Sequence, residues 1–433
     1  MTTTTPQTPA GGELAPNYFF HTFPNGMQMA GQRMPSLASV TFGIQFPAGS
    51  LAEPDEKLGL TYLLAEMAFQ GTRHRNVRQL TEDFEAIGAR HGAEPAGEYG
   101  RFWARVVNNR LDRALELIAD VLRYPAFPAD EFTQMKSIQL QEIRKRDDEP
   151  MRRLPDMMRA AFYTGTRLAR RPLGLMDTVE ALTPDDLRRF WQTHYRPNGS
   201  LLAIAGNFDW DAAVERVEAL FGDWEGTPET APVEQPDPHK GASVELDQQN
   251  QEHIGMMFPF PKYGDPDYYA AMLLGEILGG NMNSRLFREV REKRGLVYSV
   301  QAAFSPNGIF GAGTIYAGTN PEKAHETVQV ILDELRKLPA EGVTEDELAR
   351  AKVQIKSEIV MHGESSSSRM LSLARAWWFE RRLITIQEVK DAIDSVSREQ
   401  ILHLLERFPP MDRLVITAIG PRPEAELIGD ALA

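Results

Sequence analysis

Residues Asp130 to Ile143 read DEFTQMKSIQLQEI, and the similar stretch DELARAKVQIKSEI begins 216 positions later, at Asp346. Two further pairs repeat at nearly the same distance. YLLAEM at residues 62–67 resembles MLLGEI at 272–277, a shift of 210, and SLLAIAGNF resembles RLVITAIGP, whose glycines 206 and 420 are 214 apart. Three matches at nearly one offset indicate an internal duplication. A period of this length is typical of two domains with one fold and far exceeds that of a short-repeat array.

Strand and helix patterns alternate within each half of the chain. SVTFGIQFPAGS at residues 39–50 alternates as a strand does, and LDRALELIADVLRYP has helical spacing that ends before Pro125. SLLAIAGNF predicts a buried strand. These patterns predict two homologous α+β domains, each a mainly antiparallel sheet covered by helices.

The domain limits follow from composition. GTPETAPVEQPDPHKGAS at residues 226–243 is rich in Pro, Gly and polar residues, which is typical of a linker, and places a boundary near residue 235. The expected organisation is a flexible tail at 1–16, an N-terminal domain at 17–225, the linker, and a C-terminal domain at 244–433.

Composition excludes several classes of protein. The net charge of −14 disfavours nucleic-acid binding, which needs a basic surface, and is compatible with basic peptide substrates or simply with solubility. The chain has no cysteine, so it forms neither disulfides nor thiolate metal sites. No apolar run is long enough for a membrane span, and the N-terminus lacks the features of a secretory or mitochondrial signal. A cytoplasmic location is therefore predicted.

Local catalytic motifs are missing from the sequence. None of the nine histidines lies within five positions of another, so the chain contains no H-E-x-x-H or H-x-x-E-H helix. A G-x-S-x-G elbow is also absent. The glycine-rich GAGTIYAG predicts a strand rather than a phosphate-binding loop, and GESSSSR at residues 363–369 predicts a mobile polar loop.

The stretch GLTYLLAEMAFQGT, residues 59–72, predicts a helix with two faces. Its leucines share one face, while Tyr62, Ala65 and Glu66 lie on the other. Positions 62 and 66 are one turn apart, the spacing at which two side chains can share a metal ion. Glu142 falls inside the apolar arc of its own helix, where a carboxylate is either paired, bound to metal, facing a cleft or at a fraying edge.

These residues carry a resemblance to a known family. GLTYLLAEMAFQGT resembles the zinc-site helix of the pitrilysin/insulinase peptidases, the inverted zincins, which include two-domain bacterial relatives of the mitochondrial processing peptidase. The similarity extends from about Asn17 to Pro421 and is strongest in ILGGNMNSRLFREVREKRGLVYSV, residues 277–300. It implies a clamshell of the two domains that pairs with a second subunit to enclose a chamber.

The resemblance also identifies a departure. The family's H-x-x-E-H falls on Tyr62, Ala65 and Glu66, and its third ligand falls on Glu142. Zinc hydrolysis needs ligands around an open coordination position and a general base for the bound water. Both histidines and the base are replaced, so no zinc is expected in this chain. Weak binding of a hard cation by the remaining oxygen groups is a lesser alternative.

Bacterial heterodimers of this family divide the active site between two chains, and the chain without zinc supplies an arginine and a tyrosine. The matching residues are Arg294 and Tyr298. Arginine can hold a substrate carbonyl or carboxylate, and a tyrosine hydroxyl can donate to the developing oxyanion. The structural alternative is a cation in a last helical turn, a cap at Gly295 and an ordinary strand aromatic. GGNMNSRLF is either a loop near the substrate or a turn before an N-cap at Ser284.

The function expected from the resemblance is that of a non-catalytic, substrate-binding subunit of a heterodimeric zinc metallopeptidase. Its partners would be a homologous subunit that carries the zinc and peptide substrates, with no nucleic acid and no membrane. The main alternative is an inert structural or peptide-binding protein of the same fold. A peptidase with unusual metal ligands is a third possibility, which stoichiometric metal in the lone chain would support.

Overall fold

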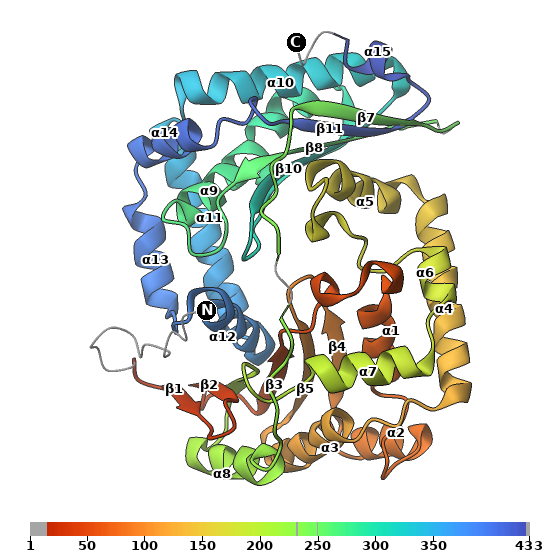
Figure 1. The fold of residues 1–433 in the computed structure, drawn as a ribbon. Helices are drawn as coiled ribbons and strands as arrows, with labels where there is room; N and C mark the ends of the chain where they lie inside the picture. The colour runs from red at the N-terminus through yellow and green to blue at the C-terminus, as the bar shows by residue number, and fades with distance from the viewer. Residues whose placement is uncertain (1–14, 231–232, 249, 430–433) are drawn as a thin grey trace. The chain divides into compact units, whose positions relative to one another are not determined.

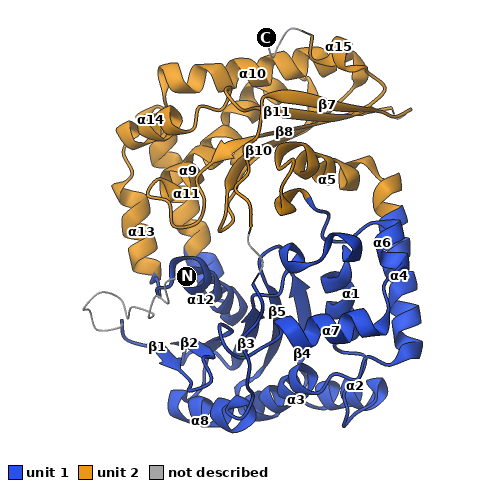
Figure 2. Ribbon diagram, viewed as in Figure 1, with its two compact units in different colours: residues 1–144, 170–232, 360–385 blue, residues 145–169, 233–359, 386–433 orange. Residues whose placement is uncertain are grey.

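The computed structural model describes residues 15–230, 233–248 and 250–429, which divide into two compact units (Figures 1 and 2). Unit 1 takes its described residues from 1–144, 170–232 and 360–385, and unit 2 takes them from 145–169, 233–359 and 386–433. Each unit contains one sheet. The predicted flexible tail lies outside the described residues except for its last two positions.

Unit 1 is built on a six-stranded sheet in the order β1-β2-β6-β3-β5-β4, in which β2 and β6 are parallel and the other neighbours antiparallel. Its strands are β1 (Tyr18–Thr22), β2 (Gln28–Arg33), β3 (Ser39–Phe46), β4 (Arg90–Pro95), β5 (Gly100–Val107) and β6 (Leu201–Gly206). Its helices are α1 (Leu60–Met67), α2 (Val77–Ala86), α3 (Leu111–Arg123), α6 (Met176–Glu180), α7 (Pro184–His194), α8 (Trp210–Phe221) and α12 (Ser366–Glu380).

Unit 2 is built on a five-stranded sheet in the order β7-β11-β8-β10-β9, in which β7 and β11 are parallel. Its strands are β7 (Gly241–Leu246), β8 (Glu252–Phe260), β9 (Val297–Ser305), β10 (Gly311–Thr319) and β11 (Val415–Gly420). Its helices are α5 (Pro150–Phe162), α9 (Tyr268–Gly275), α10 (Ala324–Glu341), α13 (Ile386–Ser395), α14 (Arg398–Arg407) and α15 (Glu424–Leu427), with π-helical turns η5 (Glu276–Gly280) and η6 (Phe287–Glu292).

Two long helices run from one unit into the other. Helix α4 (Ala129–Asp148) begins in unit 1, and α11 (Glu345–Gly363) begins in unit 2. They start 216 positions apart, the offset of the repeated stretch at Asp130 and Asp346. The duplication predicted from the sequence is therefore present in the order of the elements.

Each sheet has a main hydrophobic core on one face and a covering helix on the other. In β3, Val40, Phe42 and Ile44 enter the core with α1 and α3, whereas the alternate residues face α12. The second sheet packs in the same way, with α9 and α10 in its core and α5 on its other face. The two sheets are thus covered alike although their sequences differ.

The covering helices are exchanged between the halves of the chain. Helix α5 comes from the first half and packs on β8 and β11, while α12 comes from the second half and packs on β3 and β6 (Figure 2). A methyl group on Gly43 would lie 3.1 Å from the sulfur of Met370, and one on Gly255 would lie 2.4 Å from that of Met158. Both glycine–methionine pairs are related by the same shift of 212 positions, so the two contacts are equivalent.

The predicted fold class is confirmed, since both units are mainly antiparallel sheets covered by helices. The strand predicted in GAGTIYAG is β10. The mobile loop predicted at 363–369 is wrong, because α12 begins at Ser366 and this residue is buried. The limits 17–225 and 244–433 remain a prediction. In the described part of the chain, no helix is long and apolar enough to cross a membrane.

Candidate functional site

Helix α1 is fixed at its first turn by a buried carboxylate. The backbone N–H groups of Gly59 and Thr61 donate to Glu53 at 3.0 and 2.6 Å, and the Thr61 hydroxyl donates to it at 2.6 Å. Gly59 has φ of +90°, which favours glycine. Glu53 thereby satisfies backbone donors that every helix leaves unpaired at its start. The leucine face of α1, which the sequence predicts, is buried.

Three residues of α1 occupy the positions where the resemblance places the zinc ligands and the base. Tyr62 is half-buried, Ala65 is buried and Glu66 is exposed. Partial loss of solvent around its carboxyl group raises the pKa of Glu66. Tyr62 and Glu66 are one turn apart on α1, so at the positions given by the resemblance this helix carries a phenol, a methyl group and a carboxylate.

Glu142 lies on α4, three positions after a residue of this helix that contacts the beginning of α1. That residue is Gln139, whose side-chain amide donates to the carbonyl of Gly59 at 2.9 Å. Glu142 is half-buried, and its carboxylate has no hydrogen bond or ion pair to any described residue. Of the alternatives left open by the sequence, an internal salt bridge is therefore not found within the described ranges.

The donor set does not fit zinc. Zinc in proteins is held by three or four protein ligands, which are imidazole, thiolate or carboxylate groups. Among the residues that the structure describes, no group of three or more His, Cys, Asp or Glu side chains is arranged to hold a metal ion. Neither a metal-bound water nor a base to activate it can be assigned to α1.

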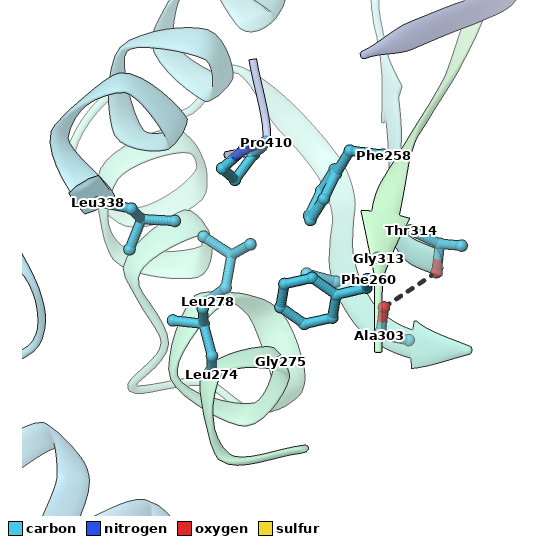
Figure 3. A pocket seen from close by; sticks show the side chains of 11 residues that line it. Phe258, Phe260, Leu274, Gly275, Leu278, Ala303, Gly313, Thr314, Leu338 and Pro410 are labelled. Carbon is cyan, nitrogen blue, oxygen red and sulfur yellow. Dashed lines mark hydrogen bonds between the residues drawn. The ribbon is translucent and has the colours of Figure 1, made fainter. Parts of the chain in front are cut away.

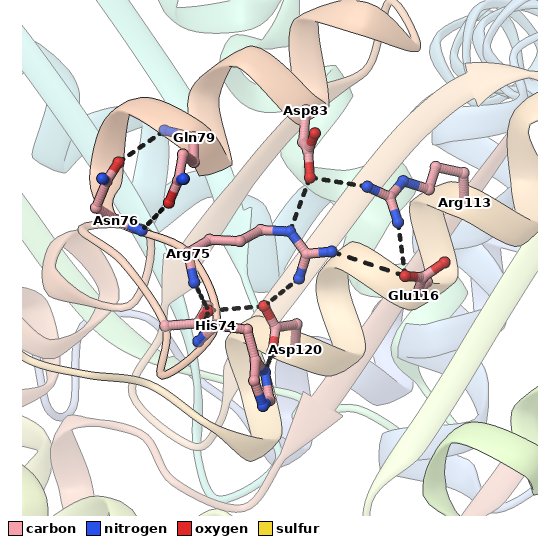
Figure 4. Close-up of polar contacts among 9 residues, drawn as sticks. His74, Arg75, Asn76, Gln79, Asp83, Arg113, Glu116 and Asp120 are labelled. Atoms are coloured by element: carbon pink, nitrogen blue, oxygen red, sulfur yellow. Dashed lines mark hydrogen bonds and ion pairs between the residues drawn. The ribbon is translucent and has the colours of Figure 1, made fainter.

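The loop that follows α1 is held by a charged network (Figure 4). The Thr72 hydroxyl donates to Asp120 at 2.7 Å, and Arg75 bridges Asp120 and Asp83. Burial opposes ionisation of Asp120, but hydrogen bonds from His74, Thr72 and Arg75 outweigh it and lower its pKa. Each charged group has an internal partner, so this network is a structural clamp on the loop.

Arg294 lies just after the turn η6. Its guanidinium donates to the backbone carbonyl of Glu289 at 2.6 Å and to its carboxylate at 3.0 Å. Gly295 has φ of +57° and ends the helical turn, as the sequence predicts. Nothing in the sequence distinguished Glu289 as the residue that holds Arg294. The contact leaves the arginine exposed at the surface.

Tyr298 lies at the start of β9, an edge strand of the second sheet. The residue is 56% exposed, and its hydroxyl donates to the side chain of Asn320. Arg294 and Tyr298 thus both lie in unit 2, four positions apart in the sequence and close to the start of β9. Asn320 directly follows β10 and is 22 positions from Tyr298 in the sequence, so no local pattern indicated this contact.

Two other features of unit 2 lie near this part of the chain. Ser284 precedes a helical turn, as predicted, but its buried hydroxyl makes no capping bond within the described residues. A pocket of about 280 Å³, open mouth included, lies between the sheet and α9 and is lined by apolar side chains such as Phe258 and Leu278 (Figure 3). Thr314 also lines this pocket, and its hydroxyl donates to the Ala303 carbonyl at 3.2 Å. The pocket offers packing space without a reactive group.

The duplicated fold, with its two helix-covered sheets, defines a class of two-domain α+β chains to which peptidases of known families can be compared. Residues 28–174 match the family model "Insulinase (Peptidase family M16)", and residues 181–355 match "Peptidase M16 inactive domain". The chain is 31% identical over 428 residues to an uncharacterized zinc protease of Streptomyces coelicolor, a match covering 95% of this chain and 92% of that protein. The chain belongs to peptidase family M16, and the predicted resemblance is confirmed.

Solved structures share the fold. A peptidase M16 inactive domain from Pseudomonas fluorescens superposes with a TM-score of 0.87 at 23% identity, covering 94% of this chain and 98% of that one. A chain of Complex III2 from Candida albicans has a TM-score of 0.80 at 20% identity, with coverages of 96% and 97%. These likenesses concern the fold alone, and the site residues must be judged on their own chemistry.

Glu53 gives the stability of this site a testable dependence on pH. Burial raises its pKa from 4.5 to about 7, although its hydrogen bonds and nearby Arg170 favour the ionised form. The folded chain thus keeps a proton that the unfolded chain loses above pH 4.5. The stability contributed by Glu53 is fully present below pH 4.5 and is lost as the pH rises through 7. The loss is about 3 kcal/mol, the pKa difference of 2.5 at about 1.4 kcal/mol per unit.

The measurement is urea unfolding of native chain and Glu53→Gln across this range of pH. The gap in unfolding free energy between the two proteins is expected to shift by about 3 kcal/mol in favour of the variant as the pH rises from 4.5 to 8. A gap that stays constant with pH would contradict a protonated Glu53 in the folded chain.

Proposed function

We propose that this chain is the non-catalytic, substrate-binding subunit of a heterodimeric zinc metallopeptidase. The observation that carries the proposal is helix α1, which has Tyr62 and Glu66 one turn apart where the resemblance puts the zinc ligands, and Ala65 where it puts the base. A family member with this helix needs zinc from another chain if it takes part in peptide hydrolysis. The expected partner is a homologous subunit with an intact H-x-x-E-H helix.

In this role the chain contributes Arg294 and Tyr298 to the partner's active site. Both side chains are exposed, and both already engage oxygen acceptors, Glu289 and Asn320. A substrate carbonyl or a developing oxyanion presents the same kind of acceptor, so each donor would exchange an internal oxygen for a substrate oxygen. Arg294 would orient the peptide, and the Tyr298 hydroxyl would stabilise the negative charge that forms as water attacks. The partner's zinc would supply the activated water when bound there.

The test compares the lone chain with the chain co-purified from its native host. The lone chain is expected to contain no stoichiometric metal and to cleave no peptide, whereas the co-purified complex contains zinc and cleaves peptides. Isolation with peptide but without any zinc-bearing homologue would favour the alternative, an inert structural or peptide-binding protein. Stoichiometric metal and activity in the lone chain would overturn both. The cytoplasmic location also remains a prediction, and fractionation of the host would test it.

A further inference from the structure

One face of the first sheet is only partly covered. Helix α12 packs on β2, β3 and β6, and the same face continues across β5 and β4 to the edge of the sheet. Strand register places three residues of each strand there in matched rows. The rows of β3, β5 and β4 are Thr41–Arg105–Arg90, Gly43–Trp103–Gly92 and Gln45–Arg101–Glu94.

Two arginines on this face have no counter-charge among the residues that the structure describes. Arg105 and Arg90 are directly opposite, with Cβ atoms about 5 Å apart in such pairs. Both are exposed, and neither side chain has a hydrogen bond or ion pair to any residue within the described ranges. Arg101 differs, because Glu94 accepts from it at 3.0 Å and neutralises it. Like charges facing each other destabilise a sheet, so this pair is unfavourable unless an anion lies between them.

Trp103 lies in the neighbouring row, between two glycines. Its ring lies over Gly92, where a methyl group would be 3.3 Å from the indole, and Gly43 flanks it on the other side. The residue is half-buried and packs partly against the α12 cluster. With no side chains on either neighbour in its row, the indole forms an apolar platform next to the two arginines.

The fold itself does not require these cations. The corresponding outer strands of the second sheet are β10 and β9, and the shift of 212 positions places Gly318 opposite Ser299 in the row where the first sheet has Arg105 opposite Arg90. The repeated half thus has neutral residues at this location. In a chain with net charge −14, the two unpaired arginines are a local positive surface against an acidic background.

We propose that Arg90, Arg105 and Trp103 form a binding surface for acidic peptide segments. A carboxylate would bind between the two guanidiniums, which present paired donors of matching geometry, and an apolar or aromatic side chain next to it would cover the indole. This inference rests on the proposed peptide-binding function and names its substrate class. The overall acidity of the chain would repel a long polyanion, so a peptide with a few carboxylates is favoured over a nucleic acid.

The test measures binding to the lone full-length chain, so it does not depend on a partner or on activity. Fluorescence anisotropy would follow a short dye-labelled peptide containing two Glu residues around a Phe, against matched peptides with Gln or Lys in place of Glu. The acidic peptide is expected to bind at least about tenfold more tightly than either, and salt should weaken it. Equal affinity for the three peptides would overturn the proposal while leaving the subunit assignment intact.

Variants identify the surface. Arg90→Ala with Arg105→Ala is expected to weaken binding about tenfold or more, whereas Lys at both positions retains part of it. Arg110→Ala, which removes an exposed arginine just after β5, is the matched control and should change nothing. The alanine variant should fold at least as stably as the native chain, since it removes a repulsion. Unchanged affinity in that variant would place binding elsewhere.

Two further measurements separate the parts of the surface. Trp103→Leu should weaken the Phe-containing peptide but leave a peptide with Ala in place of Phe unaffected. An equal loss of affinity for both peptides would show that the indole does not contact the Phe side chain. A single-stranded oligonucleotide that binds more tightly than the acidic peptide, and competes with it, would overturn the peptide assignment in favour of nucleic acid.

Discussion

A chain carrying Tyr62→His and Glu66→His is expected to bind one zinc ion per molecule, whereas the native chain is expected to bind none. The two imidazoles would be one turn apart on α1, and Glu142 lies on α4 three positions after Gln139, which contacts the start of α1. The backbone of the metal site would therefore already be in place, and only ligand chemistry is missing. The gain in affinity should be on the order of a thousandfold or more.

Metal content after dialysis and calorimetric titration with zinc would measure this gain. Adding Glu142→Gln to the double variant is the matched control, and it should weaken zinc binding by about tenfold to a hundredfold or more, because the third ligand becomes neutral. Ala65→Glu would add a base without adding a ligand, so it should leave zinc affinity nearly unchanged. A folded double variant without stoichiometric zinc would show that α1 and α4 do not have the geometry of a metal site.

The second large effect is expected in the reconstituted complex. Tyr298→Phe removes one hydroxyl, and if this group stabilises the oxyanion, kcat should fall by about a hundredfold to a thousandfold. Arg294→Ala should raise KM as well, since it removes a group that orients the peptide before reaction. Zinc content and assembly with the partner should be unchanged in both, because neither residue holds metal.

Arg291→Ala is the control for these substitutions. It removes an exposed arginine three positions before Arg294, which lies over the Phe287 ring rather than beside the strand end. This variant should retain full activity. Reconstituted complexes in which Tyr298→Phe and Arg294→Ala are as active as the native one would refute the roles assigned to this pair and leave a purely structural role for the turn.

The sequence predicts the duplication well because repeated helices keep their order and spacing. It fails where a local pattern has a non-local partner. GESSSSR has the composition of a loop, but the hydroxyl of Ser366 lies 2.9 Å from that of Thr41, a residue 325 positions away. Polar side chains in a helix become acceptable when a distant strand satisfies them. No local window contains that information.

In the candidate site, too, local features could be predicted from the sequence and non-local contacts could not. The end of the helical turn at Gly295 could be predicted, because a glycine cap is a local sequence signal. Glu53 lies in the acidic stretch EPDEK, where a solvated loop would be the ordinary expectation, yet it is fully buried. Its burial follows from the need to satisfy the first N–H groups of α1, which only the folded chain brings within reach. The unpaired arginines likewise depend on strand register, which one sequence does not specify.

The exchange of α5 and α12 has a consequence for the history and the assembly of the chain. A polypeptide consisting of one half would carry a covering helix for a sheet it does not possess, and its own sheet would lack one. Two copies could complete each other by trading these helices, which is a domain-swapped dimer. A single-half ancestor of this fold is therefore expected to have been an obligate dimer. Fusion of two such copies would turn an intermolecular exchange of helices into an intramolecular one.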